Sequence, residues 1–163
     1  MRLVAWLLFL PYIAGTAAGA NAEATPAQWS PQVWLNVGAY SQHFDHSKDF
    51  RENNNGFGAE VWFANDHALM AGTFINSDRA RSHYGAYQWR PLHWRLAGIN
   101  VGAGITLGVF DGYPSYRSGG WFPAALPVLA VEYERIGVNL FLVPTIANRL
   151  DGAVSVQLKL RVW

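Results

Sequence analysis

The stretch AGINVGAGITLGV, residues 97–109, constrains the fold of this chain more than any other segment. Apolar side chains occupy every odd position from Ile99 to Val109, and Asn, Gly or Thr occupies the even positions between them. Alternation with period two indicates a β-strand. None of its thirteen residues is charged, whereas a strand of a soluble sandwich normally exposes charged residues on its outer face. A transmembrane barrel instead turns apolar residues toward lipid and small or polar residues toward its lumen.

Similar alternation along the chain predicts eight strands, which we expect over residues 32–44, 56–64, 67–76, 82–90, 97–109, 123–133, 136–143 and 152–162. In the last strand, Lys159 and Arg161 alternate with apolar residues. Facing lipid, each would cost about 2–4 kcal/mol near the midplane. We therefore expect them inside the barrel, where Glu60 and Glu132 can meet them. The other mid-strand polar residues are also expected to pack in the lumen: Asn36, Gln88, Asn100 and Asn139.

The connections between these strands alternate between long polar loops and tighter turns. The first, third, fifth and seventh are DHSKDFRENNNG, SDRAR, DGYPSYRSGGW and TIANRLDG, and the others are ND, RPLHWRL and ER. Outer-membrane barrels have long loops outside and short turns in the periplasm. The sequence therefore predicts an all-β fold, an eight-stranded antiparallel transmembrane β-barrel in the bacterial outer membrane.

Two shorter patterns predict a turn and a set of residues at the membrane interfaces. The run from Asn53 to Gly56 is typical of a flexible turn, because Asn and Gly tolerate positive φ. Tryptophans at or near strand ends are typical of the aromatic girdles at the two membrane interfaces. Such girdles account for many of the tryptophans at the ends of the expected strands or along them, which are Trp29, Trp34, Trp62, Trp89, Trp94, Trp121 and Trp163.

The first 22 residues are expected to form a cleaved signal peptide, with the barrel domain over residues 23–163. Arg2 precedes an apolar run that ends in small residues, and no charge follows before Glu23; this order is typical of secretory signals. The alternative is a retained membrane helix, because the uncharged run is about as long as a membrane span. Pro11 and the Ala- and Gly-rich second half favour cleavage.

Composition excludes several classes of function. The 163 residues suit one domain, and a formal net charge of +1 argues against a nucleic-acid-binding surface. The chain has no Cys, which rules out disulfides and thiolate metal sites. His43 and His46 lie near Asp45 and Asp49, but their spacing matches no strong zinc pattern. We expect no metal, no cofactor, no nucleic-acid partner and a monomeric protein.

Several segments, in order along the chain, resemble the PagP family of outer-membrane lipid A palmitoyltransferases. The resemblance is carried by FDHSKDFRENNNGFG (44–58), LMAGTFINS (69–77), YQWRP (87–91), NVGAGITLGV (100–109), LPVLAVEY (126–133) and VPTIANRLDGAVSVQLKLRVW (143–163). It implies a tilted eight-stranded barrel with an acyl-chain pocket in its outer half. It also implies transfer of a palmitoyl chain from a phospholipid to lipid A, so that the expected partners are phospholipid and lipid A or lipopolysaccharide.

The functional residues of the family carry over only in part. Its Asp-Ser pair falls on Asn76 and Ser77, and an amide cannot take the proton that a carboxylate can. Its histidine falls near Ala39, whereas His43 lies four residues further on, on the same face of the strand. Its glycine at the floor of the acyl pocket falls on Gln88, whose larger side chain would fill or shorten that pocket.

The candidate catalytic set combines Ser77 and His43, with Asp78 or Asp45 as the orienting carboxylate and Asn76 beside them. Acyl transfer needs an activated hydroxyl, a proton shuttle and an orienting group. The alternative is that these are polar rim residues solvated by water or lipid headgroups. The resemblance places the acyl pocket near Gln88, Gly102, Gly104, Pro127 and Pro144. It also suggests lateral entry of an acyl chain at Pro123, Pro127 and Pro144; the alternative is that these prolines simply end strands.

The phosphate-binding candidates are Lys48, Arg51, Arg79 and Arg81, because lipid A carries phosphates and arginine pairs with phosphate in bidentate geometry. The alternative is ordinary loop charge balanced by nearby Asp and Glu.

Two functions remain open from sequence. The first is a PagP-like barrel that binds acyl chains or lipid A at the outer leaflet and can act as an acyltransferase. The second is a non-catalytic barrel that serves envelope integrity, adhesion or passage of a small solute. An internal acyl-sized cavity would favour the first function. A lumen filled by side chains, as is common in eight-stranded barrels, would favour the second.

Overall fold

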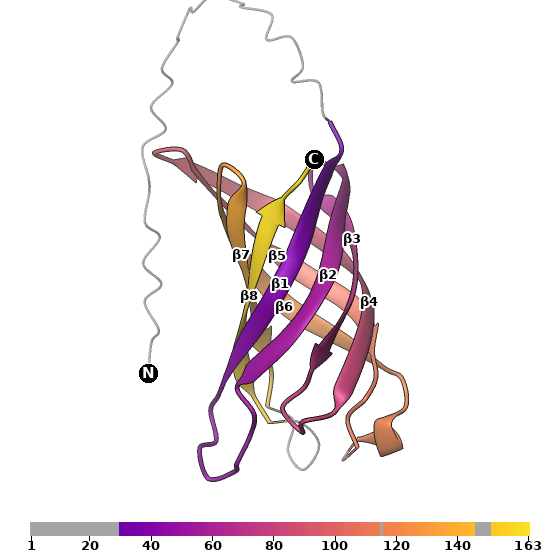
Figure 1. Ribbon diagram of the computed structural model, residues 1–163. Helices are drawn as coiled ribbons and strands as arrows, with labels where there is room; N and C mark the ends of the chain where they lie inside the picture. Colours follow the sequence, from indigo (N-terminus) through magenta and orange to yellow (C-terminus); the bar gives the residue numbers. More distant parts are fainter. Residues whose placement is uncertain (1–29, 115, 146–150) are drawn as a thin grey trace, which may run out of the picture.

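The computed structural model describes residues 30–114, 116–145 and 151–163, and in them eight antiparallel strands close into a barrel (Figure 1). Each strand pairs with the next, and β1 pairs with β8 to complete the ring. The strands are β1 (Gln32–His43), β2 (Asn53–Ala64), β3 (His67–Ile75), β4 (Arg81–Leu96), β5 (Ile99–Phe110), β6 (Phe122–Tyr133), β7 (Ile136–Val143) and β8 (Ala153–Arg161).

This architecture confirms the predicted all-β, eight-stranded antiparallel barrel. A short 3-10 turn, Arg117–Gly119, lies in the loop between β5 and β6. Within the described residues, no helix is long and apolar enough to cross a membrane. The signal peptide expected over residues 1–22, the start of the domain expected at residue 23, and Trp29 lie outside the described residues.

The outer face of the wall is apolar, and the inner face is small or polar. On β5, Thr106 is 2% exposed while its neighbour Leu107 is 46% exposed, which is the alternation expected from the sequence. The outward apolar side chains include Leu35, Val37, Phe57, Val61, Leu69, Leu107, Leu129, Leu142, Leu158 and Leu160. Such a belt is the surface that a transmembrane barrel presents to lipid.

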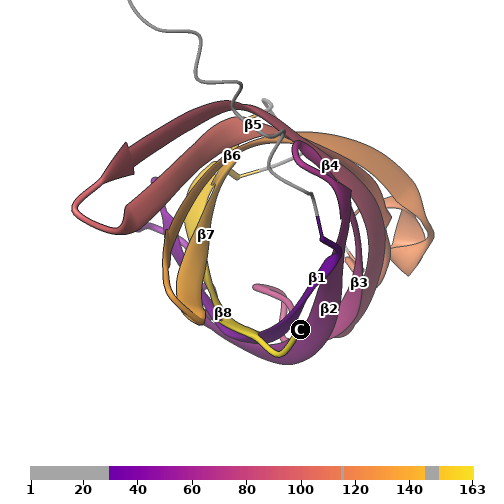
Figure 2. The ribbon, with the colours of Figure 1, turned by 90° about the horizontal axis from the view of Figure 1, so that it is seen from above.

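The longer loops lie at one end of the barrel, and two-residue turns lie at the other end with the C-terminus (Figure 1). One predicted connection was wrong, because β4 continues through Pro91 to Leu96. The register shifts between Trp89 and Leu92, and such an irregularity accommodates a proline that cannot donate to the ladder. The β4–β5 hairpin therefore projects beyond the ring (Figure 2). Asn100, expected in the lumen, is exposed on this projection.

The turn expected from Asn53 to Gly56 is also corrected, because these residues begin β2. Asn54 is 3% exposed, and its Nδ2 donates to the carbonyl oxygen of Ile75 at 2.9 Å. The neighbouring strand thus accepts a hydrogen bond from an amide that the sequence alone suggested would be solvated in a loop.

A β-bulge in β1 reverses which residues face the lumen. Gly38 has φ +71°, a left-handed conformation that glycine adopts without steric cost, and the pairing with β2 shifts between Val37 and Ala39. Before the bulge, Trp34 and Asn36 point inward; after it, the inward residues are Ala39, Ser41 and His43. The extra residue in the strand is what turns His43 into the lumen.

The half of the lumen nearer the two-residue turns is filled by four charged side chains, which we call the ionic floor: Glu60, Arg90, Glu132 and Lys159. Lys159 Nζ lies 2.8 Å from Glu60 Oε1 and 2.7 Å from Glu132 Oε1. Arg90 Nη1 lies 2.8 Å from the same Glu132 oxygen. The expectation that Lys159 meets Glu60 and Glu132 inside the barrel is confirmed.

Two tryptophans complete this filled region. Lys159 Nζ lies 4.6 Å from a ring centroid of Trp34, and Arg90 Cζ lies 4.0 Å from one of Trp62, in the range of cation–π attraction. Trp34 and Trp62 are 1% and 4% exposed, so their assignment to the aromatic girdles was wrong. The cation–π contacts with Lys159 and Arg90 stabilise the inward orientation of the two rings.

Candidate functional site

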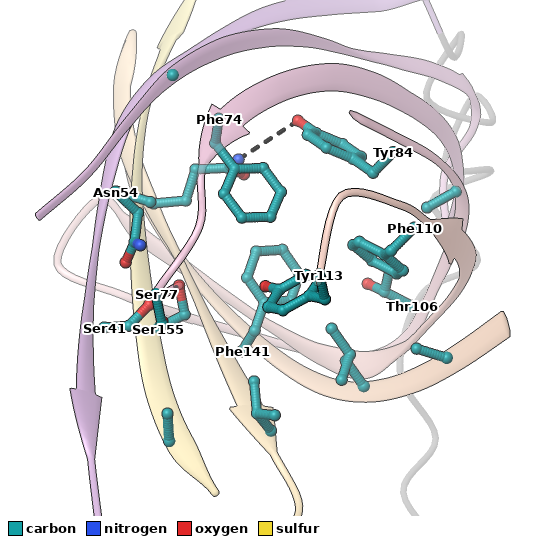
Figure 3. A pocket seen from close by; sticks show the side chains of 18 of the residues that line it. Ser41, Asn54, Phe74, Ser77, Tyr84, Thr106, Phe110, Tyr113, Phe141 and Ser155 are labelled. Atoms are coloured by element: carbon teal, nitrogen blue, oxygen red, sulfur yellow. Dashed lines mark hydrogen bonds between the residues drawn. The ribbon is translucent and has the colours of Figure 1, made fainter. Parts of the chain in front are cut away.

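The half of the lumen at the loop end is hollow. It contains a cavity of about 500 Å³ (Figure 3). Aromatic and aliphatic side chains from several strands and loops form most of its wall, namely Phe50, Phe74, Phe110, Phe122, Leu126, Phe141 and Val143. A deep cavity lined in this way suits an apolar ligand.

His43, Ser77 and Asp78 all line this cavity, close to the loops that form its mouth. The carbonyl oxygen of Ser77 accepts a hydrogen bond from the backbone N–H of Arg51 at 3.0 Å. The preceding residue, Phe50, stacks on the ring of His43 with centroids 4.4 Å apart. The β1–β2 loop therefore brings the loop that carries Ser77 close to the end of the strand that carries His43. Nδ1 of the buried His43 has no hydrogen-bond partner among the described residues.

Asn76 lies behind this group, fully buried, and organises the loop between β3 and β4. Its Oδ1 accepts hydrogen bonds from the backbone N–H groups of Asp78 and Ala80, each at 3.0 Å. Its Nδ2 donates to Ser82 Oγ at 2.9 Å and to the carbonyl oxygen of Gly112 at 2.7 Å. Both halves of the amide are used, so Asn76 holds Ser77 and Asp78 in place and does not itself line the cavity.

Asp45 is exposed and is not among the described residues that line the cavity. Its Oδ1 accepts hydrogen bonds from the N–H of Ser47 at 2.9 Å and from Ser47 Oγ at 2.6 Å. The side-chain bond is the main cause that lowers the Asp45 pKa. This geometry suits a loop turn, whereas Asp78 and Asp151 are carboxylates that line the cavity together with His43. Within the described part of the chain, no group of three or more His, Asp or Glu could hold a metal ion.

Two of the four phosphate candidates are already paired with loop carboxylates. Lys48 Nζ lies 2.7 Å from Asp151 Oδ1, and this hydrogen bond raises the Lys48 pKa. Arg79 Nη2 lies 2.8 Å from Asp49 Oδ2. Arg51 Nε donates to its own loop, to the carbonyl oxygen of Asn53 at 2.6 Å, and Arg81 is exposed at the start of β4. Phosphate binding by these four residues stays a prediction.

Of the five acyl-pocket candidates, Pro144 is among the residues that line the cavity. Gln88 is fully buried next to the cavity and donates to Met70 Sδ at 3.3 Å and to Thr106 Oγ1 at 3.1 Å, both of which belong to cavity-lining residues. Gly102 faces the Arg90 side chain, which belongs to the ionic floor. Gly104 lies where a side chain would collide with the backbone of β4. Pro127 is exposed on β6.

The wall beside the cavity is incompletely hydrogen-bonded. The described pairing between β6 and β7 begins at Val128 and Phe141, so the outer part of β6, from Phe122 to Pro127, pairs with β5 alone. Pro123 and Pro144 line the cavity on the two sides of this gap. Lateral entry of an acyl chain at the prolines stays a prediction, and the interruption lies beside two of them, Pro123 and Pro144.

Tyr113 is a cavity-lining residue that the sequence gave no reason to select. It comes from the β5–β6 loop and packs edge-on against Phe122, with ring centroids 5.7 Å apart. Figure 3 shows its hydroxyl pointing toward the side of the cavity where Ser77 lies. Burial and the Asp78 carboxylate raise the Tyr113 pKa. No periodicity marks it, because its position depends on how an irregular loop folds over the mouth.

Comparison with known proteins agrees with this geometry. Residues 25–158 match the family model described as "Antimicrobial peptide resistance and lipid A acylation protein PagP". A curated relative named "Lipid A acyltransferase PagP", from Laribacter hongkongensis (strain HLHK9), is 37% identical over 83 residues. That match covers 49% of this chain and 38% of the relative. Because the family model spans most of the sequence and the barrel carries the fold expected of it, the chain belongs to the PagP family.

Proposed function

We propose that this protein is an outer-membrane acyltransferase that moves an acyl chain from a phospholipid to lipid A. The observation that carries the proposal is the apolar cavity of about 500 Å³, with His43, Ser77 and Asp78 among its lining residues. A barrel with a lumen filled by side chains, the alternative left open by the sequence, would lack such a space. The name of the Laribacter relative, a lipid A acyltransferase, supports lipid A as the acceptor. The protein acts as a monomer, since each barrel contains a complete cavity.

The donor enters from the outer leaflet through the gap between β6 and β7, beside Pro123 and Pro144. Its acyl chain then lies against the phenylalanine side chains of the cavity wall, and its ester group stays at the mouth. Burial of apolar area stabilises this complex by about 25 cal/mol per Å².

The reaction proceeds in two balanced steps. First, Ser77 Oγ attacks the ester carbonyl, His43 takes the hydroxyl proton, and the bond to the phospholipid breaks. His43 returns the proton to the departing lysophospholipid alkoxide, which leaves an acyl-Ser77 ester. Second, a lipid A hydroxyl attacks that ester, gives its proton to His43 and releases Ser77, which regains the proton. No proton or electron is consumed overall.

Asp78 and Tyr113 serve the same steps. The Asp78 carboxylate stabilises the imidazolium that forms on His43 during each proton transfer. The Tyr113 hydroxyl, kept protonated by its raised pKa, donates to the oxyanion of the tetrahedral intermediate. A donor prepositioned for that charge is among the larger contributions to acyl-transfer catalysis.

The test is mass spectrometry of lipid A from a Gram-negative host that lacks its own palmitoyltransferase. Cells that carry the wild-type chain are expected to add one acyl mass to lipid A, and S77A cells to add none. S47A, which removes a hydroxyl from an exposed loop residue, is the matched control and is expected to behave as wild type. An added mass that persists in S77A would retain the acyltransferase and reject Ser77 as nucleophile. Unchanged lipid A from folded wild-type protein would reject the acyltransferase.

A further inference from the structure

The deep end of the cavity is polar, in contrast to its apolar wall. Four side chains from four strands lie there and form what we call the polar shelf: Asn36 on β1, Tyr84 on β4, Thr106 on β5 and Gln157 on β8. All four line the cavity. Asn36 and Gln157 lie two residues along their strands from Trp34 and Lys159, so the shelf is one layer above the ionic floor.

The shelf has hydrogen-bonding capacity that the protein does not use. Asn36 is 1% exposed, and neither polar atom of its amide has a partner in hydrogen-bond geometry among the described residues. The Tyr84 hydroxyl is close enough to interact with Asn36, and it accepts a long hydrogen bond from Gln157 Nε2 at 3.4 Å (dashed in Figure 3). A buried amide without hydrogen-bond partners destabilises the fold. Because Asn36 lies at the end of a ligand cavity, the bound ligand is the group that can supply the missing partner.

The surroundings define what that partner can be. Gln88 and Asn139 are both fully buried and lie beside the shelf. The ionic floor closes the lumen below it. A chain that enters from the mouth must therefore end at this layer. A terminal methyl group would leave the amide unsatisfied, whereas a hydroxyl can donate to Asn36 Oδ1 and accept from Asn36 Nδ2.

We propose that the polar shelf is a subsite for a hydroxyl group at or near the far end of the ligand's acyl chain. This inference rests on the proposed function, because it takes the cavity to be an acyl-chain site. The shelf then selects a hydroxylated chain over an unsubstituted chain of the same length. The selection arises from a directional polar contact at the end of the cavity, while the apolar wall holds both chains alike.

The depth of the cavity sets the position of the hydroxyl. From Asn36 to His43, β1 advances seven residues, one of them absorbed by the bulge, which is about 20 Å at ~3.3 Å per residue. A strand tilt of about 40° leaves about 15 Å along the barrel axis. Three bonds of a fully extended chain span about 3.8 Å, so the hydroxyl belongs about twelve bonds from the ester carbonyl.

The experiment compares 12-hydroxydodecanoate with dodecanoate as ligands of the refolded full chain in detergent micelles, by isothermal titration calorimetry. We expect the hydroxylated acid to bind about two- to tenfold more tightly, the factor that one additional hydrogen bond supplies. In N36L, which replaces the amide by an apolar group of similar size, the preference should vanish or reverse. S155A removes a hydroxyl higher in the same cavity, hydrogen-bonded to Ser41, and should keep the preference. Folding of each variant is checked by the heat-modifiable mobility of the barrel on gels.

The outcomes separate this inference from the proposed function. Equal affinity for the two acids in the wild type, or a preference that survives in N36L, would overturn the polar subsite and leave acyl binding intact. If neither acid binds the folded wild type, the acyl cavity itself is rejected, and the subsite with it.

Discussion

The side-chain Nδ2 of Asn76 donates a hydrogen bond of 2.7 Å to the backbone carbonyl oxygen of Gly112. The contact joins the β3–β4 loop to the β5–β6 loop, the two segments that supply Ser77, Asp78 and Tyr113 to the cavity. A carboxylate cannot make it, because it has no hydrogen to donate. The amide at the position of the family's aspartate is therefore matched to its surroundings in this protein.

We expect N76D to lower the free energy of unfolding by about 1–3 kcal/mol, because the carbonyl of Gly112 and the new carboxylate face each other without a proton between them. The measurement is urea unfolding of the refolded chain. N55D makes the same chemical change at an exposed position of β2 and should leave stability nearly unchanged. Stability of N76D equal to or greater than that of the wild type would show that the hydrogen bond to Gly112 does not stabilise the fold.

The bulge at Gly38 should decide the direction of every inward residue in the outer half of β1. If residue 38 stayed in β1 without the bulge, simple alternation would turn Ser41 and His43 toward lipid and Gln42 toward the lumen. G38V keeps the residue and disfavours the left-handed conformation that the bulge requires. The chain has no cysteine, which allows single-cysteine labelling. S41C should react with a water-soluble maleimide through the cavity, and G38V should suppress that reaction and enhance labelling of Q42C.

The control is deletion of Gly38, which removes the extra residue, so that simple alternation still places Ser41 and His43 inward and the labelling pattern should stay as in the wild type. G38A should also retain the bulge and the labelling of S41C, at a cost of about 1–2 kcal/mol for a left-handed alanine. Unaltered labelling in G38V would mean that the bulge is imposed by β2 and β8 and not by Gly38.

Lys159 should be the costliest lysine to replace. K159M leaves the buried Glu60 and Glu132 without their shared cation, and loss of one partner from a buried ion pair costs about 3–5 kcal/mol. K48M breaks a solvent-exposed pair with Asp151 and should change stability little. Unfolding midpoints of the two variants in guanidinium check this order, and a K159M barrel as stable as K48M would contradict it.

Tyr113 should make the protein sensitive to alkaline pH. Its pKa is raised in the folded state by burial and by Asp78, so the unfolded chain loses this proton first. The contribution of Tyr113 to the free energy of unfolding is therefore fully present below the tyrosine pKa of the unfolded chain, near 10. It falls as the pH rises above that value. In Y113F the alkaline loss of stability should be smaller than in wild type. Y116F removes a hydroxyl from the same loop as a control, and identical alkaline curves for Y113F and wild type would refute the assignment.

Several features of the fold follow from local sequence. The alternation from Ile99 to Val109 correctly predicted the strand and, apart from Asn100 on the projecting hairpin, the inward and outward faces, since side chains on a strand alternate by geometry. The long and short connections correctly predicted which end carries the loops. The placement of Lys159 beside Glu60 and Glu132 could also be predicted, because a charge in a membrane barrel has only the lumen in which to find a partner.

Other features could not be read from local pattern. The asparagine run at 53–55 has turn composition, yet Asn54 is paired within β2 because Ile75 on the next strand offers it an acceptor. Trp34 and Trp62 have the composition of interface residues, yet they face inward over Lys159 and Arg90. Each of these depends on a partner distant in the chain.

The candidate site shows the same division. The sequence by itself determined the chemical groups available, Ser77, His43 and Asp78, and the strand order that allows their loops to meet at one end. Only the tertiary structure decided that His43 points inward, that Asp78 and not Asp45 shares its cavity, and that Tyr113 and the polar shelf belong to it. The reason is physical: alternation and loop length are local properties of the chain, whereas a bulge, a cavity and a buried amide are defined by contacts between strands that meet only when the barrel closes.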